Sequence, residues 1–171
     1  MENIQLNHTH HKPSGVKYPV CLLVHDFDVP MNIGSLFRIA DAFGLEKIYL
    51  TGSSLVPPNN KIKKTSRSTE KYVAYSYEND PVHVIEKLKS EGYTIISLEI
   101  TSTSIDITEL KISHNENICL VVGAESKGVS QELLDASDKT VHIPMLGINS
   151  SMNVATACAV ATFEIIRRYE K

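Results

Sequence analysis

The chain alternates between unbroken apolar runs and segments whose apolar residues recur every three or four positions. The runs VCLLVHDF (20–27) and NICLVVG (117–123) lack the polar alternation of a half-exposed strand, so they predict strands buried on both faces of a parallel sheet. Shorter runs of the same kind predict four more strands: KIYLTG (47–52), VAYSY (73–77), YTIISLEI (93–100) and KTVHIPM (139–145).

The first helix is predicted from Asn32 to Phe43, because its apolar residues have helical spacing and Gly44 follows as a stop signal. Pro30 is expected to break the chain before this helix. The apolar positions are Ile33, Leu36, Phe37, Ala40 and Phe43.

Two shorter helices are predicted further along the chain. Asp80 and Pro81 supply an N-cap and a first-turn proline for a helix that runs to Gly92, and Ser130 is expected to cap the helix QELLDA (131–136). Because strands alternate with helices, the sequence predicts an α/β fold with a mostly parallel sheet and helices on both faces.

The last helix has an unusual composition. From Val154 to Phe163 it carries small and apolar residues and no charge, which predicts a helix buried nearly all round. One face of a small sheet does not easily cover such a helix, so we expect a homodimer. A polar turn, residues 147–153, comes directly before it.

The polar residues 1–18 are expected to form a flexible arm, and residues 19–171 a single domain. No apolar run is long enough to span a membrane, and the arm has no apolar stretch typical of a signal sequence. Three cysteines inside apolar runs predict buried free thiols, so we expect a cytoplasmic protein. The arm histidines, His8, His10 and His11, have no accompanying ligands, and no metal is expected.

The formal net charge is −3, so any affinity for nucleic acid must come from a local patch. The segment KIKKTSRSTEK (61–71) offers such a patch, with Glu70 as its single acid. Its composition is compatible with either a solvated loop or an RNA-binding surface. The basic residues are Lys61, Lys63, Lys64, Arg67 and Lys71.

Three unusual loops follow apolar strands, where the ligand crevice of a parallel sheet lies. They are DFDVPMNIGSLFRIADAFG, VVGAESKGVS and IPMLGINSSMN. None contains the glycine pattern of a phosphate loop or of a dinucleotide-binding fold. Ser150 and Ser151 also lack the G-x-S-x-G setting of a hydrolase nucleophile.

Taken together, these loops resemble the three motifs of the SpoU (TrmH) family of RNA ribose 2′-O-methyltransferases, in the SPOUT class. The residues that match the first motif are Asn32, Gly34, Arg38, Ala42 and Gly44. Those of the second are Gly123, Glu125 and Gly128. Those of the third are Ile143, Pro144, Met145, Gly147, Ser151, Asn153 and Val154, with Met152 in place of the family's leucine.

The resemblance implies a C-terminal trefoil knot, S-adenosyl-L-methionine as cofactor and an RNA substrate. It implies cofactor contacts at Leu98, Gly123, Ile143 and Met152. The residues that it implies for catalysis are Asn32, Arg38, Glu125, Ser151 and Asn153.

Each of the implied catalytic residues also has a structural interpretation. Asn32, Ser151 and Asn153 are residue types that cap helices. Glu125 is suited to binding backbone amides at a helix start. A neutral guanidinium is costly, so we expect Arg38 to hold phosphate and stabilise oxyanion charge rather than act as the base. The identity of the general base stays open.

The basic segment after the second strand is similar to that of tRNA-specific members, which favours tRNA over rRNA as the substrate. We expect RNA affinity from that segment, the arm, Arg167 and Arg168. The alternative is an RNA-binding scaffold with the same fold and no catalysis. Because such a scaffold has no need of Arg38, Asn32 and Asn153 together, the enzyme is the favoured interpretation.

Overall fold

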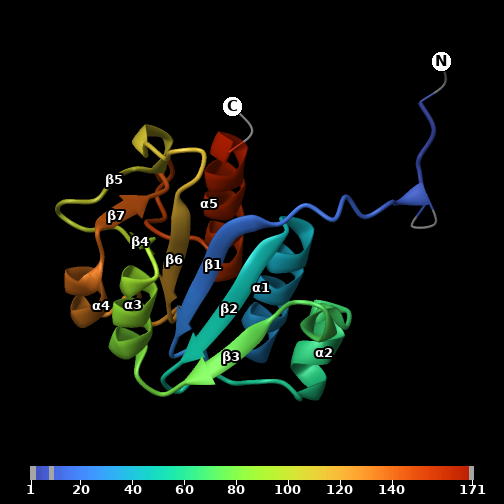
Figure 1. The fold of residues 1–171 in the computed structure, drawn as a ribbon, viewed down its shortest axis with the longest axis horizontal. Coiled ribbons are helices and arrows are strands. Elements are labelled where there is room, and N and C mark those ends of the chain that lie inside the picture. Colours follow the sequence, from blue (N-terminus) through green and yellow to red (C-terminus); the bar gives the residue numbers. More distant parts are fainter. Residues whose placement is uncertain (1–2, 8–9, 170–171) are drawn as a thin grey trace.

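The structure is a computed structural model that describes residues 3–7 and 10–169. Within these residues, seven parallel strands form one sheet in the order β3-β2-β1-β6-β4-β7-β5 (Figure 1). The predicted parallel α/β sheet is confirmed. The strands are β1 (Tyr18–His25), β2 (Leu45–Thr51), β3 (Tyr75–Glu78), β4 (Tyr93–Leu98), β5 (Ile105–Asp106), β6 (Asn117–Gly123) and β7 (Lys139–His142).

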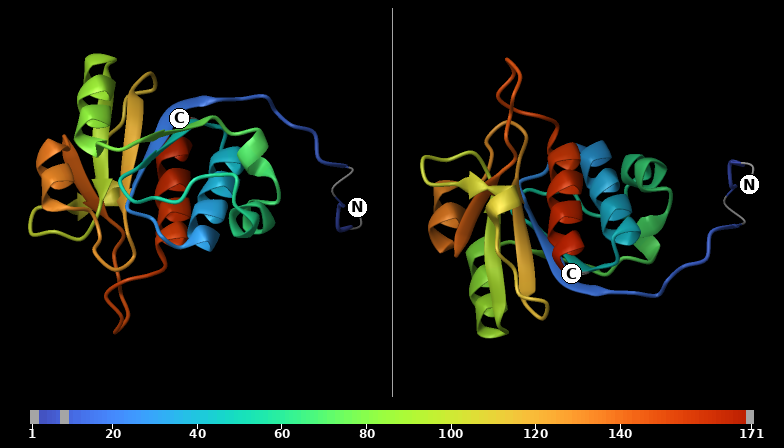
Figure 2. Two further views of the ribbon diagram at one scale, coloured as in Figure 1. Left: turned by 90° about the horizontal axis from the view of Figure 1, so that it is seen from below. Right: turned by 90° about the horizontal axis from the view of Figure 1, so that it is seen from above.

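Helices cover both faces of the sheet, as the sequence predicts. Helices α1 and α5 lie side by side on one face, with α2 against α1, and α3 and α4 lie on the other face (Figure 2). Between residues 18 and 169, the 3₁₀ turns are η2 (Thr69–Lys71) and η3 (Ile107–Glu109). The helices are α1 (Pro30–Ala42), α2 (Asn60–Ser66), α3 (Pro81–Ser90), α4 (Gln131–Ala136) and α5 (Val154–Tyr169).

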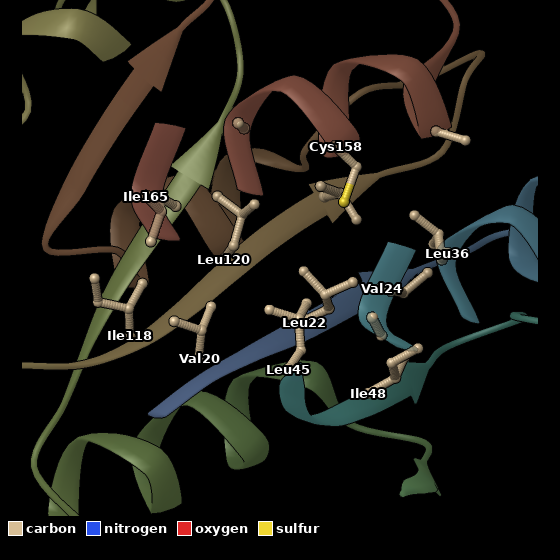
Figure 3. Packing of buried hydrophobic residues seen from close by; sticks show 14 of the residues in the cluster. Val20, Leu22, Val24, Leu36, Leu45, Ile48, Ile118, Leu120, Cys158 and Ile165 are labelled. Atoms are coloured by element: carbon tan, nitrogen blue, oxygen red, sulfur yellow. The ribbon is translucent and has the colours of Figure 1, made fainter. Parts of the chain in front are cut away.

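Alternate residues of β1 enter two hydrophobic clusters. Leu22 and Val24 pack in the cluster that includes α1 and α5, whereas Cys21 and Leu23 pack with α3 and α4 (Figure 3 shows the first cluster). All four side chains are buried, as an unbroken apolar run in a parallel sheet requires. The three cysteines are free and buried, as the sequence predicts.

Helix α1 begins two residues earlier than the sequence predicts. Pro30 is its first residue instead of a break before it, because the fixed φ of proline suits the first turn and its missing N–H is not needed there. Val29 occupies the N-cap position without a side-chain bond, so the expectation that Asn32 caps the helix is wrong. Asn32 is the third helical residue, and its side chain is buried.

The start of the basic segment is a helix, α2, and not a loop. Asn59 caps it, because its Oδ1 accepts hydrogen bonds from the N–H groups of Lys61 and Ile62 at 2.9 and 3.3 Å. Ile62 is buried against the first cluster, and the helix crosses α1 at Gly34. A Cβ on Gly34 would lie 2.8 Å from the carbonyl oxygen of Ile62, so this close crossing requires glycine.

Helix α5 is not buried all round within the chain. Val160 and Phe163 are 42% and 57% exposed, whereas Cys158, Ala161 and Ile165 on the opposite side are buried in the first cluster. The small residues allow α5 to pack against α1 and β6, and one apolar strip faces outward.

The segment from His11 to Lys17 forms neither helix nor strand, and it extends away from the sheet in Figures 1 and 2. Of the predicted arm, residues 1–2 and 8–9, His8 among them, lie outside the described residues, and so do residues 170–171 of the predicted domain. No helix among the described residues has the length and hydrophobicity needed to cross a membrane.

Candidate active site

A cleft of about 750 Å³ lies at the carboxyl edge of the sheet. Leu98, Gly123 and His142 line it, and each is the last residue of its strand, β4, β6 or β7. The segment between β7 and α5 forms another wall, and it projects from the domain in Figure 2. Parallel strands therefore bring the second and third unusual loops to one place, as the sequence predicts.

The residues proposed for cofactor contacts all line this cleft. Leu98, Ile143 and Met152 are partly buried and supply apolar walls, whereas Gly123 is buried. Such a combination of apolar walls and backbone polar groups is typical of small-molecule sites.

The turn after β6 depends on glycine. The N–H of Gly128 donates to the carbonyl of Ala124 at 2.7 Å, which folds the turn back on the strand. A Cβ on Gly123 would lie 1.9 Å from the carbonyl oxygen of Gly128, so no other residue fits at position 123 without a backbone shift. The tight turn leaves Glu125 exposed at the cleft.

Three of the predicted catalytic residues form one hydrogen-bonded network. The Nδ2 of Asn153 donates to Oε1 of Glu125 at 2.7 Å and to Oδ1 of Asn32 at 3.1 Å. The Nδ2 of Asn32 donates to Oε2 of Glu125 at 3.1 Å. Each carboxylate oxygen of Glu125 thus accepts one amide N–H, which fixes the carboxylate relative to both α1 and α5.

Asn153 is also the N-cap of α5. Its Oδ1 accepts from the N–H groups of Ala155 and Thr156 at 3.0 and 3.2 Å, so the capping role considered for it is confirmed. Glu125 binds side-chain amides, not the backbone amides of a helix start. Ser151 lines the cleft and is exposed, and within the described residues its hydroxyl makes no hydrogen bond and caps no helix.

Arg38 lies apart from the cleft. It is exposed on α1, does not line the cleft, and forms no hydrogen bond or ion pair with the described part of the chain. The structure therefore joins Asn32, Glu125 and Asn153 and leaves Arg38 free for an external anion. Its catalytic role stays a prediction.

Glu99 and His142 are among the cleft residues that were not singled out from the sequence. Glu99 accepts the N–H groups of Ile100 and Val129, each at 2.9 Å, and so ties β4 to the loop after β6. His142 Nδ1 lies 3.0 Å from the hydroxyl of Ser104. Glu99 stands near the carboxyl end of the predicted strand 93–100, so the rule that ligands bind at the carboxyl ends of parallel strands could have located it. His142 lies in the middle of the predicted strand 139–145, and only the observed end of β7 places it at this edge.

A polar cluster lies at the end of β1, which pairs with β6 in register at His25 and Gly123. Asp26 adopts a left-handed backbone (φ 60°), and its Oδ1 accepts the N–H and the hydroxyl of Ser53 at 2.8 and 3.1 Å. The N–H bond from Ser53, together with the charges of His25 and Lys127, lowers the pKa of Asp26 below its usual value. A carboxylate is therefore retained beside the loop that carries Glu125.

The basic residues of the predicted RNA-binding segment, Lys61, Lys63, Lys64, Arg67 and Lys71, are all exposed on α2 and the turn that follows it. By contrast, Arg167 and Arg168 are engaged within the chain. Both pair with Glu164 at 2.6 Å, and Arg168 also donates to the carbonyl of Thr108 at 2.8 Å. Among the described residues, no group of three or more histidine, cysteine or carboxylate side chains is arranged to hold a metal.

Sequence comparison agrees with this geometry. Residues 19–163 match the model of the SpoU rRNA Methylase family, a span that includes the whole cleft. The chain belongs to the SpoU rRNA Methylase family.

Named relatives and solved structures are consistent with that assignment. The chain is 31% identical over 148 residues to the tRNA (guanosine(18)-2′-O)-methyltransferase of Thermus thermophilus, covering 86% of this chain and 74% of that protein. It is 28% identical over 144 residues to the 23S rRNA (guanosine(2553)-2′-O)-methyltransferase RlmP of Bacillus subtilis, covering 84% of this chain and 56% of that protein, little more than half its length. The crystal structure of the SpoU methyltransferase AviRb from Streptomyces viridochromogenes in complex with AdoMet has the same fold, with a TM-score of 0.79 at 24% identity, covering 86% of this chain and 59% of that one.

Proposed function

We propose that this chain is an RNA methyltransferase that uses S-adenosyl-L-methionine to methylate a ribose 2′-hydroxyl. The observation that carries the proposal is the Asn32–Glu125–Asn153 network at the edge of the cleft, because it joins a residue of each family motif. Named 2′-O-methyltransferases among the relatives support the choice of the ribose hydroxyl.

The cleft fits the cofactor. Its volume of about 750 Å³ is within the range of small-molecule sites. Leu98, Ile143 and Met152 provide apolar surface suited to an adenine ring, and Ser150 and Asn149 provide polar groups at the other wall. When bound, the sulfonium of S-adenosyl-L-methionine supplies an activated methyl group.

The chain's own residues must hold the ribose hydroxyl in line and accept its proton as the O2′–CH₃ bond forms and the S–CH₃ bond breaks. Glu125, fixed by Asn32 and Asn153, presents its remaining lone pairs at the cleft, where they orient a donor group. Ser151 lines the same cleft and supplies a further hydroxyl. We propose that Arg38 binds the substrate phosphate and stabilises the negative charge that develops on the ribose oxygen, because a guanidinium is a strong hydrogen-bond donor that does not lose its proton.

We also propose that the active form is a homodimer. The exposed strip of Val160 and Phe163 on α5 lies beside Phe43, the residue that follows α1, and the ring centroids of Phe43 and Phe163 are 6.1 Å apart. Met31 on α1 is a further exposed apolar residue. Arg38 lies on an exposed position of the same helix α1. A dimer formed on this surface would cover the apolar strip and bring Arg38 to the interface.

We infer a trefoil knot in the C-terminal part. The chain leaves β7, which lies beside β4, and reaches α5, which packs near β6 and α1. Residues of the connecting segment 143–153 line one cleft with residues of 98–100 and 122–129, and this proximity supports the threading.

We favour tRNA as the substrate, with rRNA as the alternative, on the likeness to the Thermus enzyme and on the basic residues of α2. Lysines and an arginine exposed together supply the local positive charge that the chain's net charge of −3 does not.

Two measurements separate this enzyme from a scaffold with the same fold. Calorimetry with S-adenosylhomocysteine should show binding to one site per chain. Incubation with tritiated cofactor and unmodified tRNA should then transfer label to the RNA. Cofactor binding without methyl transfer to tRNA or rRNA would favour the scaffold. A chain that binds neither S-adenosylhomocysteine nor RNA would contradict the proposal.

A further inference from the structure

Tyr72 differs from the other tyrosines of the chain. It is 77% exposed, and in the part of the chain that the structure describes its side chain makes neither a ring contact nor a hydrogen bond. The other six each make such a contact: Tyr18 with Tyr169, Tyr49 with Lys47, Tyr75 with Phe37, Tyr77 with Gly52, and Tyr93 with Glu46.

The backbone that carries Tyr72 is firmly held. The N–H groups of Tyr72 and Val73 both donate to the carbonyl of Thr69, at 2.9 and 3.0 Å. Val73 is buried in the first hydrophobic cluster. The tyrosine ring is thus presented to solvent by a fixed turn, which lowers the entropy lost when a ligand packs on it.

The charge around this turn is almost entirely positive. Arg67 and Ser68 adopt left-handed backbone conformations, and the hydroxyl of Ser66 holds the turn by donating to the Glu70 carboxylate and accepting the N–H of Ser68. Ser66 is buried, so the one acid of the segment is directed inward. The cations stay exposed: Lys61, Lys63, Lys64, Arg67 and Lys71.

A single exposed apolar side chain is ordinary on a protein surface. An exposed, fixed aromatic ring that directly follows a run of exposed cations is the arrangement by which proteins bind single-stranded nucleic acid, with bases stacked on rings and phosphates held by cations. In duplex RNA the bases are already stacked and their faces are unavailable.

We propose that Tyr72 is a stacking platform for an unpaired base of the RNA, and that the cations of α2 and η2 hold the flanking phosphates. This proposal rests on the proposed function, since it takes RNA to be the substrate. It adds that the substrate presents an unpaired nucleotide, in a loop or a single strand, to this surface.

The test measures binding of two labelled RNAs, a short hairpin with an unpaired loop and a blunt duplex of equal length, at several salt concentrations. Tyr72→Ala should weaken hairpin binding about five- to hundred-fold and leave the salt dependence and the duplex affinity nearly unchanged. Tyr72→Phe should bind like the parent chain, because the ring is kept, whereas Tyr72→Leu should lose affinity as alanine does.

Two further variants separate stacking from charge. The double variant Lys63→Ala/Lys64→Ala should lower the affinity for both the hairpin and the duplex. The slope of log affinity against log salt concentration should fall by about 0.7–0.9 for each phosphate that the variant no longer neutralises. Ile105 is an exposed apolar residue on β5, at the opposite edge of the sheet. Ile105→Ala is the control and should change neither the affinities for the two RNAs nor the salt dependence.

The outcomes distinguish the two proposals. Parent-like hairpin binding by Tyr72→Ala or Tyr72→Leu would overturn the platform and leave the RNA methyltransferase standing. An equal loss on hairpin and duplex would also overturn it, because stacking on an unpaired base would not be the cause. A parent chain that binds neither these RNAs nor tRNA would overturn both proposals.

Discussion

Asn32 and Asn153 are separated by 121 positions in the sequence, and the Nδ2 of Asn153 donates a 3.1 Å hydrogen bond to Oδ1 of Asn32. Glu125 accepts one hydrogen bond from each of them, so the starts of α1 and α5 and the turn after β6 are tied together at one point. Two residues that line the cleft, Glu125 and Asn153, are thus held in fixed positions relative to each other.

The first prediction separates the two roles of Asn153. Asn153→Ser keeps an N-cap oxygen but loses the amide donors, whereas Asn153→Ala loses both. In urea unfolding, the free energy of unfolding of Asn153→Ala should be about 1 kcal/mol lower than that of Asn153→Ser, the usual contribution of an N-cap side chain. Both variants should bind S-adenosylhomocysteine or transfer methyl groups less well than the parent. Parent-like transfer by Asn153→Ser would show that the network with Glu125 is not needed.

Arg38 carries the second prediction. Arg38→Ala should leave the unfolding midpoint and cofactor affinity nearly unchanged, because within the described chain Arg38 makes no hydrogen bond or ion pair, but it should remove most methyl transfer. Arg38→Lys should rescue poorly, since an ammonium cannot form a bidentate grip on phosphate. Lys87→Ala, which removes an exposed cation from α3 on the other face, is the control and should be active. Turnover of Arg38→Ala at the parent rate with saturating RNA and cofactor would refute the assignment.

The third prediction concerns the exposed strip of α5. Light scattering of the parent at micromolar concentration should report a dimer, and Val160→Asp with Phe163→Asp should report a monomer, because two carboxylates cannot be buried there without partners. Val56→Asp, at an exposed apolar residue outside this strip, should stay dimeric. A parent chain that is stably monomeric contradicts the proposed assembly.

The fourth prediction is a pH dependence of stability. Hydrogen bonds from Arg167, with the charge of Arg168, lower the pKa of Glu164 below its usual value. A carboxylate whose pKa is lower in the folded state stabilises that state above the pKa of the unfolded chain, about 4.3, and the contribution is lost as the pH falls through the lower folded pKa. Glu164→Gln should therefore unfold more easily than the parent at neutral pH, and the difference should shrink below about pH 4. A difference that stays constant down to about pH 3 would rule out this ion pair as its cause.

The sequence predicted the elements whose signals are local. Unbroken apolar runs located β1 and β6, and Asp80 caps α3 as expected, with its Oδ1 accepting the N–H of Val82 at 2.9 Å. The rule that ligands bind at the carboxyl ends of parallel strands predicted that the second and third loops lie together at the cleft.

Other features depend on contacts that a local pattern does not contain. Helix α2 was missed because its charge suggested a loop, although Asn59 is a recognisable cap and Ile62 has a buried site only because Gly34 on α1 leaves room for it. The composition of α5 indicated that the helix needs more cover than one small sheet face provides, but it did not reveal that Val160 and Phe163 form the side left exposed within the chain. The two-residue strand β5 exists through pairing with β7, which its polar surroundings did not indicate.

The central claim is methyl transfer to a ribose hydroxyl, and nucleoside mass spectrometry tests it most directly. RNA from a strain that lacks the gene should be incubated with the purified protein and S-adenosyl-L-methionine, digested to nucleosides and compared with untreated RNA and with RNA treated with Arg38→Ala. The account predicts that one 2′-O-methylated nucleoside increases in the tRNA or rRNA fraction with the parent protein, and that Arg38→Ala produces little of it. A methyl group on a base, or no new methylated nucleoside in either fraction, would contradict it.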